Sequence, residues 1–204
     1  YETFDEDAEL VARELEITLT SRPVSKGTRV PMAGVPHHAA PGYIAKLIDK
    51  GYRVAIAEQV GEPTGRGPME RRVERVVTPG TLLEPEMLDE RRPNYVAAIV
   101  VDGQRAGVAY AEISTGEFAT TQLQDGDNVV SAVRQELTRL QPRELLIPRA
   151  GSWKEREPDQ PAERPEAELA EPLQALVTAW PIYRFEETAA RQTLVEHFDV
   201  RTLE

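Results

Sequence analysis

The stretch that decides the fold is Tyr95-Val-Ala-Ala-Ile-Val-Val-Asp-Gly-Gln-Arg-Ala-Gly-Val-Ala-Tyr-Ala-Glu-Ile-Ser-Thr-Gly-Glu-Phe-Ala-Thr-Thr-Gln-Leu123. Residue types that favour strands are frequent in three segments of it. Asp102-Gly103 and Thr115-Gly116 separate these segments and fit hairpin turns. The stretch therefore predicts an antiparallel meander of three strands, at Tyr95–Val101, Arg105–Ser114 and Glu117–Leu123.

A helix and a further strand follow the meander. One stripe of the predicted helix carries Val129, Val130, Val133, Leu137 and Leu140. Glu144–Ile147 is expected to form a strand, so the segment 94–204 predicts an α/β domain. Glutamates and prolines dominate Ser152–Pro172, which we expect to be a flexible loop. Tyr183–Phe185 and Thr188–Phe198 predict a short strand and an amphipathic helix.

The residues before this domain predict a second α/β unit. Asp7–Ile17 has the periodicity of an amphipathic helix with acidic residues in its first turn. A second helix is expected to begin near Pro41 and to end at Gly51. Tyr52–Ile56 and Arg71–Val77 then predict strands.

A turn and a linker are expected after the second of these strands. With a period of two, one face of that strand would carry Arg71, Val73, Arg75 and Val77. Pro79 and Gly80 fit the central positions of a type II turn. Residues 82–93 are rich in charge and proline and predict a linker with at most one helical turn. We therefore expect two domains, over residues 1–81 and 94–204.

The composition is that of a globular protein. The 204 residues are 40% hydrophobic and 29% charged and include no cysteine, which excludes a disulfide scaffold and a cysteine nucleophile. No apolar run approaches the roughly 18 residues of a membrane span, and Tyr1–Glu9 is acidic, unlike a signal peptide. We therefore expect no membrane association and a cytoplasmic location. Because the chain begins with Tyr1, we expect it to be a piece of a longer protein.

The charge is unevenly distributed. The formal net charge is −11, which by itself disfavours binding to nucleic acid. Residues 1–81 carry 11 basic and 12 acidic side chains, whereas residues 94–204 carry 11 basic and 19 acidic ones. The acidity therefore belongs to the second domain, and the first domain offers one basic stretch, around Arg71, Arg72 and Arg75, to a polyanion.

Several catalytic chemistries are not indicated. The chain has no G-x-x-x-x-G-K-[ST] phosphate loop, so we expect neither a nucleotide cofactor nor ATP hydrolysis. His37 and His38 are neighbours that would point to opposite sides of an extended chain, which disfavours a metal site. Mg²⁺-dependent phosphodiester cleavage would need carboxylates that converge on paired ions, and the candidates Asp102, Glu112 and Glu117 lie at predicted turns. We expect no catalytic residue.

Four motifs, in this order, resemble the amino-terminal part of the MutS family of bacterial DNA mismatch-repair proteins. They are Tyr1-Glu-Thr-Phe-Asp-Glu-Asp-Ala, Pro31-Met-Ala-Gly-Val-Pro-His-His, Val54-Ala-Ile-Ala-Glu-Gln-Val-Gly-Glu-Pro63 and Gly67-Pro-Met-Glu-Arg-Arg-Val-Glu-Arg-Val-Val-Thr-Pro-Gly-Thr81. The resemblance implies a mixed-sheet mismatch-recognition domain over residues 1–81, without its first strand. It also implies an RNase H-like connector domain over residues 94–204, without a nuclease active site.

The resemblance implies a DNA-contacting role for Glu2. In the family, a Phe-x-Glu motif enters the minor groove, and Tyr1-Glu2 matches its last two positions. The phenylalanine would precede Tyr1, so we expect the chain by itself not to discriminate mismatches. Phosphates and burial against a base disfavour a carboxylate, and a protonated Glu2 could donate a hydrogen bond to the base.

The resemblance also implies phosphate contacts and partners. The residues it assigns to phosphate positioning are Arg22, in a loop that begins near Ser21, together with Arg71, Arg72 and Arg75, while Lys26 is a weaker candidate. The implied partners are duplex DNA with a mismatch or small loop, MutL, and a second subunit in a homodimer. ATP and Mg²⁺ would bind outside this chain. A metal-dependent nuclease and a pure protein-interaction module remain alternatives.

Overall fold

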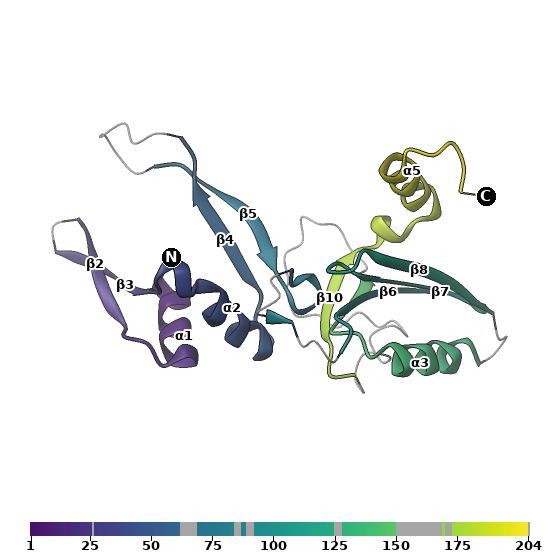
Figure 1. Ribbon diagram of the computed structural model, residues 1–204, viewed down its shortest axis with the longest axis horizontal. Coiled ribbons are helices and arrows are strands. Elements are labelled where there is room, and N and C mark those ends of the chain that lie inside the picture. Colours follow the sequence, from purple (N-terminus) through teal and green to yellow (C-terminus); the bar gives the residue numbers. More distant parts are fainter. Residues whose placement is uncertain are drawn as a thin grey trace. The chain divides into compact units, whose positions relative to one another are not determined.

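The computed structural model divides the chain into two compact units, Tyr1–Arg92 and Pro93–Glu204 (Figure 1). It describes residues 1–25, 27–61, 69–83, 87–88, 92–124, 128–149, 169 and 173–203. Within these ranges, no helix has both the length and the apolar character needed to cross a membrane. The predicted arrangement of two α/β units is confirmed.

The second unit is built on one mixed sheet of five strands. They are β6 (Tyr95–Asp102), β7 (Arg105–Glu112), β8 (Glu117–Gln124), β9 (Glu144–Arg149) and β10 (Leu176–Pro181). Their order across the sheet is β10-β9-β6-β7-β8. Strands β6, β7 and β8 pair antiparallel, whereas β9 runs parallel to both β6 and β10. The predicted meander is confirmed, and the strand order agrees with the RNase H-like architecture that the resemblance implies.

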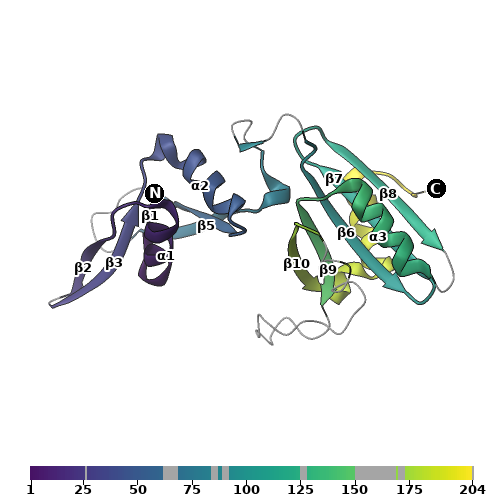
Figure 2. The same cartoon turned by 90° about the horizontal axis from the view of Figure 1, so that it is seen from below.

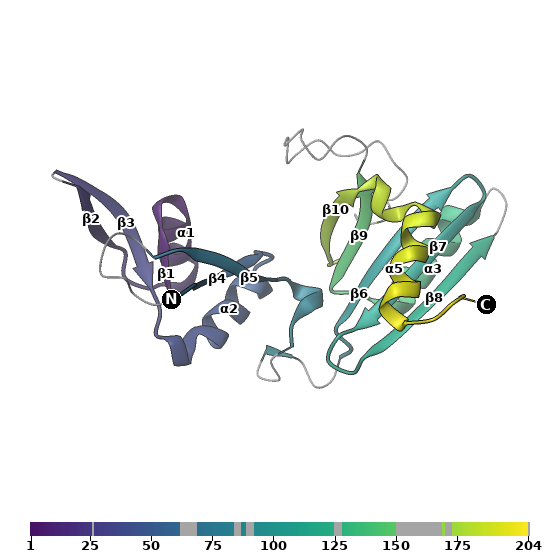
Figure 3. The ribbon, with the colours of Figure 1, turned by 90° about the horizontal axis from the view of Figure 1, so that it is seen from above.

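Helix α3 (Val129–Leu140) covers one face of this sheet, and helix α5 (Glu187–Phe198) lies on the other (Figures 2 and 3). The predicted stripe of α3 packs on the sheet, because the four residues that it buries are Val129, Val133, Leu137 and Leu140. They join Ile99, Val108 and Leu145 in one hydrophobic core. Burial of this apolar surface is the main stabilising contribution to the unit.

Two expectations for the end of the chain are wrong, and a third falls almost entirely outside the described residues. Residues Ile182–Phe185 form a 3₁₀ helix in place of a strand, because the strand of this region is β10, which pairs with β9 before Pro181 ends it. Helix α5 buries none of its residues, so it is not the amphipathic helix expected. Leu169, inside the expected loop 152–172, is fully buried in the core, and the rest of that loop lies outside the described residues.

The first unit contains two separate sheets and two helices. Strands β1 (Glu2–Phe4), β2 (Thr20–Ser25) and β3 (Thr28–Gly34) form one sheet in the order β1-β3-β2, and β4 (Val54–Gln59) pairs with β5 (Arg71–Val77). Helix α1 (Asp5–Leu15) packs on β1 and β3, and helix α2 (Ala40–Asp49) packs on β4. Gly51 follows α2 with a φ of +86°, which confirms the predicted helix end.

The expected loop that begins near Ser21-Arg22 is a strand. Strands β2 and β3 form an antiparallel hairpin that projects from the unit (Figure 1). Pro23 and Pro31 lie within these strands. Because proline cannot donate a hydrogen bond to a strand ladder, its presence in the sequence argued against strands here. Strand β1 was not predicted either, because three residues are too few to show the period of two of a strand.

Two expectations for the chain around β5 are also wrong. The register of β4 and β5 shifts between Ile56 and Ala57, and this bulge breaks the alternation along β5. As a result Val73 is 56% exposed while Val77 is buried, so the two do not share one face. Residues Pro79–Thr81 form a 3₁₀ helix capped by Thr78, and Gly80 lacks the positive φ of a type II turn.

The predicted linker begins inside the core of the first unit. Leu82 is buried together with Ile48, Ile56 and Val77. Residues 84–86 and 89–91 of that linker lie outside the described ranges.

An ion pair links helix α1 of the first unit to Lys50, the residue that follows α2. The Nζ of Lys50 donates to the Oε2 of Glu14 at 3.0 Å and to the Glu14 carbonyl oxygen at 2.6 Å. Arg13 approaches the other carboxylate oxygen at 3.1 Å. The hydrogen bond from Lys50, followed by that from Arg13, holds the pKa of Glu14 below its usual range.

Truncation of the core residue Leu137 is expected to destabilise the second unit. The L137A change should lower the free energy of unfolding by about 2–5 kcal/mol, because it leaves a cavity under the sheet. Urea unfolding followed by tryptophan fluorescence reports on this unit, since Trp153 and Trp180 are the two tryptophans of the chain. The control L203A, at a side chain that is 43% exposed, should change stability by less than about 0.5 kcal/mol. Equal effects of the two changes on the free energy of unfolding would contradict the burial of Leu137 in this core.

The contribution of Glu14 to stability should depend on pH. Because its folded-state pKa lies below the ordinary 4.5, the ionised carboxylate stabilises the fold above that pH, and this contribution is lost as the pH falls through the lowered pKa. Glu14→Gln should therefore destabilise the protein at neutral pH and have little effect in strong acid. Urea unfolding followed by circular dichroism measures this, with the exposed Glu9→Gln on the same helix as control. A destabilisation that is the same at both pH values would contradict the assignment.

Candidate nucleic-acid interface

The carboxylate of Glu2 lies at the exposed start of β1. Its side chain is 43% exposed, and its Oε2 accepts a hydrogen bond from the Nη1 of Arg22 at 3.2 Å. Arg22 belongs to β2, so this contact reaches over the central strand β3. The side chain of Arg22 is 53% exposed, and an ion pair this open to water contributes at most about 1 kcal/mol. The pair can therefore exchange for other charged partners at small cost.

The backbone around Glu2 is held closely against β3. Glu2 pairs with Gly34 in the ladder, and a Cβ atom on Gly34 would lie 3.2 Å from the carbonyl oxygen of Tyr1. Next to this pair, the backbone nitrogen of Tyr1 donates to the Val35 oxygen at 2.8 Å, and the Val35 nitrogen donates to the Tyr1 oxygen at 2.9 Å. The position of Glu2 is therefore fixed by backbone contacts on both sides of Gly34.

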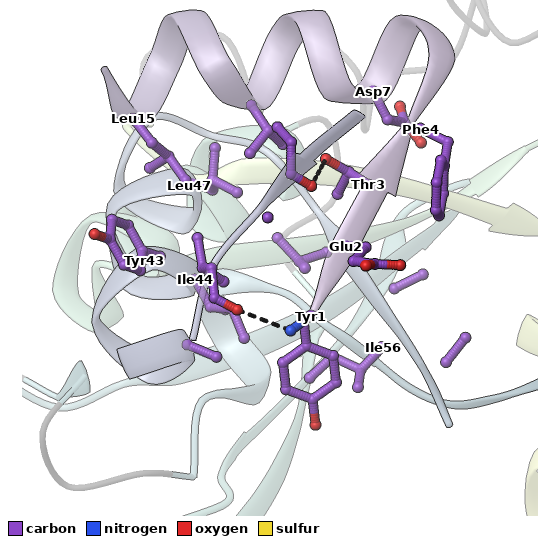
Figure 4. Close-up of a pocket in the computed structure, with 18 of the residues that line it drawn as sticks. Tyr1, Glu2, Thr3, Phe4, Asp7, Leu15, Tyr43, Ile44, Leu47 and Ile56 are labelled. Carbon is purple, nitrogen blue, oxygen red and sulfur yellow. Dashed lines mark hydrogen bonds between the residues drawn. The ribbon is translucent and has the colours of Figure 1, made fainter. Parts of the chain in front are cut away.

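A cavity of about 850 Å³ lies beside Glu2 (Figure 4). Tyr1 and the residues of β1 line one part of it, and Figure 4 shows Tyr43, Ile44 and Leu47 of α2 on another part. Arg71, at the start of β5, also lines this cavity. Glu2 and one of the predicted phosphate-binding arginines therefore face the same space.

The three predicted arginines of the second sheet all lie on β5. Arg71 and Arg72 are exposed, and Arg75 is half-buried. In the ladder with β4, Arg72 stands opposite Glu58. The Nη2 of Arg72 is 3.9 Å from the Oε1 of Glu70, and both side chains are more than 70% exposed. The guanidinium groups of Arg71 and Arg72 are thus accessible to a polyanion.

Tyr1 connects the two groups of candidate residues. Its hydroxyl donates to the Oε1 of Glu58 at 2.5 Å, and its ring stacks on His37 with the centroids 5.4 Å apart. The hydrogen bond to Glu58 raises the pKa of the Tyr1 phenol above its usual value. The sequence did not indicate that Glu58 and His37 contact Tyr1, although both residues lie inside the quoted motifs. Tyr1 and Glu58 are 57 positions apart, and no periodicity relates them.

The structure thus brings the predicted residues together in two groups. Glu2 and Arg22 lie on the sheet β1-β3-β2, and the three arginines of β5 lie on the sheet β4-β5. Both sheets belong to the first unit. The weaker candidate Lys26 lies outside the described residues.

Asp102 lies far from the other two carboxylates of the nuclease alternative, although Glu112 and Glu117 stand opposite one another in the β7–β8 ladder. Glu112 stands opposite Tyr95 at one end of the β6–β7 ladder, and Asp102 stands at the other end. Seven residues of strand, at about 3.3 Å each, separate these positions by about 23 Å. The two ions of such a site lie about 3.5–4 Å apart, so the carboxylates that hold them must lie close together. The geometry therefore argues against a two-metal site made of these residues.

The carboxylates at the Glu112 end already have hydrogen-bonding partners. Glu112 accepts from the backbone nitrogen of Asn94 at 2.9 Å and from the Thr115 hydroxyl at 2.8 Å. Glu117 accepts from the Tyr95 hydroxyl at 3.1 Å. In the described part of the chain, no group of three or more histidine, aspartate or glutamate side chains could hold a metal ion. These carboxylates hold the hairpin and the start of β6 in place.

Comparisons with known proteins cover both units. The family profile described as MutS domain I matches residues 1–86, and that described as MutS domain II matches residues 94–204. The chain is similar over its whole length to proteins named DNA mismatch repair protein MutS. The identity is 40% for that of Dehalococcoides mccartyi strain 195, 43% for that of Symbiobacterium thermophilum and 45% for that of Thermosynechococcus vestitus.

The chain spans about a fifth of the length of these curated relatives, 22% in the first two and 23% in the third. The two profiles follow one another in the order of the two compact units. The second profile alone covers more than half of the chain. On this evidence the chain belongs to the MutS family.

Proposed function

We propose that the chain is the amino-terminal part of a DNA mismatch-repair protein and that its first unit contacts mismatched duplex DNA. The observation that carries this proposal is the match of residues 1–86 to MutS domain I, combined with an accessible Glu2 beside accessible arginines. The relatives named above are DNA mismatch repair proteins, which supports the same role. A role on chromosomal DNA would place the protein in the bacterial cytoplasm.

Glu2 is the proposed base-contacting residue. Its carboxyl is accessible, and its position is fixed by the β1–β3 ladder. A phosphate that takes over the guanidinium of Arg22 would free the carboxyl for the base, because the exposed pair is weak. In its protonated form Glu2 can donate a hydrogen bond to an acceptor of the mispaired base.

The arginines are proposed to position the duplex. Arg22, Arg71 and Arg72 are exposed or partly exposed and present guanidinium groups, which bind phosphate oxygens in a bidentate manner. Arg75, further along β5, is assigned to the same role. Such contacts fix orientation without reading sequence.

The second unit is proposed to act as a connector. Its excess of acidic side chains disfavours DNA and favours protein partners, of which MutL is the one implied for the family. Exposed aromatic side chains, including Phe118, Trp180 and Tyr183, support a protein-binding role. ATPase domains and dimer contacts would lie in other parts of the protein, and since the chain has no phosphate loop, ATP and Mg²⁺ would bind there.

Replacement of Glu2 tests the proposed function. In the full-length protein, Glu2→Ala should reduce the preference for a duplex with one G·T mismatch over its matched twin, while matched binding changes little. Glu2→Gln should keep much of the preference, because an amide can also donate a hydrogen bond. Fluorescence anisotropy at fixed salt measures both affinities.

The control for Glu2 is Glu9→Gln, an exposed acidic residue of α1. It removes the same charge from the first unit and should leave the mismatch preference unchanged. A Glu2→Gln protein that loses as much preference as Glu2→Ala would contradict hydrogen-bond donation. A wild-type protein without any mismatch preference would contradict the proposed function.

Replacement of the β5 arginines tests the phosphate contacts. The logarithm of DNA affinity falls linearly with the logarithm of salt concentration, and each phosphate contact contributes about 0.9 to the slope. Arg71→Ala and Arg72→Ala should each reduce the slope by about that amount on matched and mismatched duplexes alike. Arg134→Ala, at an exposed position of α3 in the second unit, is the matched control. An unchanged slope in Arg71→Ala or Arg72→Ala would exclude that residue from the contact.

A further inference from the structure

We infer that Tyr1 is a positioning residue, whose hydrogen bond to Glu58 fixes the strand that carries Glu2 to the hairpin that carries the arginines. This inference rests on the proposed function and adds to it a link between the two groups of DNA contacts. The link is a side-chain contact, since β1-β3-β2 and β4-β5 are separate sheets in the described structure.

Tyr1 is anchored at three points. Its backbone makes two hydrogen bonds with Val35, its ring stacks on His37, and its hydroxyl donates to Glu58. The first two anchors lie in the segment that follows β3, and the third lies on β4. Tyr1 therefore bridges the two sheets at the position next to Glu2.

Glu58 connects Tyr1 to the arginines, because it lies on the strand that pairs with β5. It is paired in the ladder with Arg72, and the next pair is Gln59 with Arg71. A displacement of Glu58 relative to Tyr1 would therefore be a displacement of these arginines relative to Glu2. The acceptor of this 2.5 Å hydrogen bond is a carboxyl oxygen, and hydrogen bonds to carboxylates are stronger than those between neutral groups.

The two kinds of DNA contact differ in how much misplacement they tolerate. A hydrogen bond to a base weakens steeply when its length or angle departs from the optimum. Phosphate contacts depend mainly on charge and on counterion release, which change little with small shifts. Loss of the Tyr1–Glu58 bond should therefore impair base reading while it leaves phosphate binding intact.

Four substitutions separate this bond from charge and from general stability. Tyr1→Phe removes the donor and keeps the ring on His37. Glu58→Ala removes the acceptor and a charge, whereas Glu58→Gln removes the charge and keeps an acceptor oxygen. Thr3→Val is the matched control, because the Thr3 hydroxyl donates to the Ala33 oxygen at 3.3 Å within the sheet β1-β3-β2.

The experiment measures the affinity of the full-length protein for a G·T duplex and its matched twin over a range of salt concentrations. Tyr1→Phe and Glu58→Ala should each lower the mismatch preference by about two- to tenfold. The salt slope should stay unchanged in Tyr1→Phe. Glu58→Gln should lose less of the preference than Glu58→Ala, because it keeps an acceptor but gives up the charge that strengthens the bond. The double variant Tyr1→Phe/Glu58→Ala should lose no more than the greater of the two single losses, because one bond is removed in each case.

Thermal unfolding of every variant checks that each one folds. Wild-type preference in Tyr1→Phe and Glu58→Ala would overturn the inference and leave the proposed function standing. Equal losses in Glu58→Gln and Glu58→Ala would also overturn it, because the charge and not the hydrogen bond would then matter. A loss of mismatch preference in Thr3→Val as large as that in Tyr1→Phe would also overturn the inference, because any disturbance of strand β1 would then have the same effect. A wild-type protein without mismatch preference would overturn the proposed function itself, together with this inference.

Discussion

The arrangement of the candidate interface depends on the close pairing of β1 with β3. This ladder has only three residue pairs, and one of them places Glu2 opposite Gly34. A side chain at Gly34 would press on the Tyr1 carbonyl at 3.2 Å, so the absence of a Cβ permits the approach of the two backbones. The two hydrogen bonds between Tyr1 and Val35 extend the pairing by one step. A strand too short to be stable alone thereby holds an accessible carboxyl in one place.

The surface around this strand combines fixed backbones with weakly paired charges. Glu2 and Arg22 are each about half exposed, and Arg72 approaches Glu70 only to 3.9 Å. Pairs of this kind contribute little to stability, so their exchange for phosphate or base contacts costs little. The ion pair of Glu14 with Lys50, by contrast, is more buried on its carboxylate side and links α1 to the residue that follows α2. Rigid strands with exchangeable side chains suit a surface that receives a charged ligand.

The sequence predicts best the elements whose periodicity reflects one buried face. The stripe of α3 and the meander β6-β7-β8 are confirmed, because in both the apolar residues face one core and so recur at the period of the element. Strands β2 and β3 were not predicted, because both contain a proline, β2 is largely exposed and β3 buries only Ala33 fully. No alternating apolar pattern therefore marks them. At the candidate site, residue identities come from motifs, but the Tyr1–Glu58 contact joins positions 57 residues apart. Such a contact is decided by how the two sheets pack, which local patterns do not encode.

The division of charge between the two units agrees with the separate roles proposed for them. Residues 1–81 are nearly neutral overall, with exposed arginines on one hairpin, whereas residues 94–204 carry eight more acidic than basic side chains. In the proposed function, the acidic surface of the second unit would disfavour contact with a polyanion, whereas the exposed arginines of the first unit would favour it. The carboxylates of the second unit that face one another, Glu112 and Glu117, are engaged by Asn94, Thr115 and Tyr95. Their oxygens therefore hold the hairpin and the start of β6, which supports the proposed connector role over that of a metal-dependent nuclease.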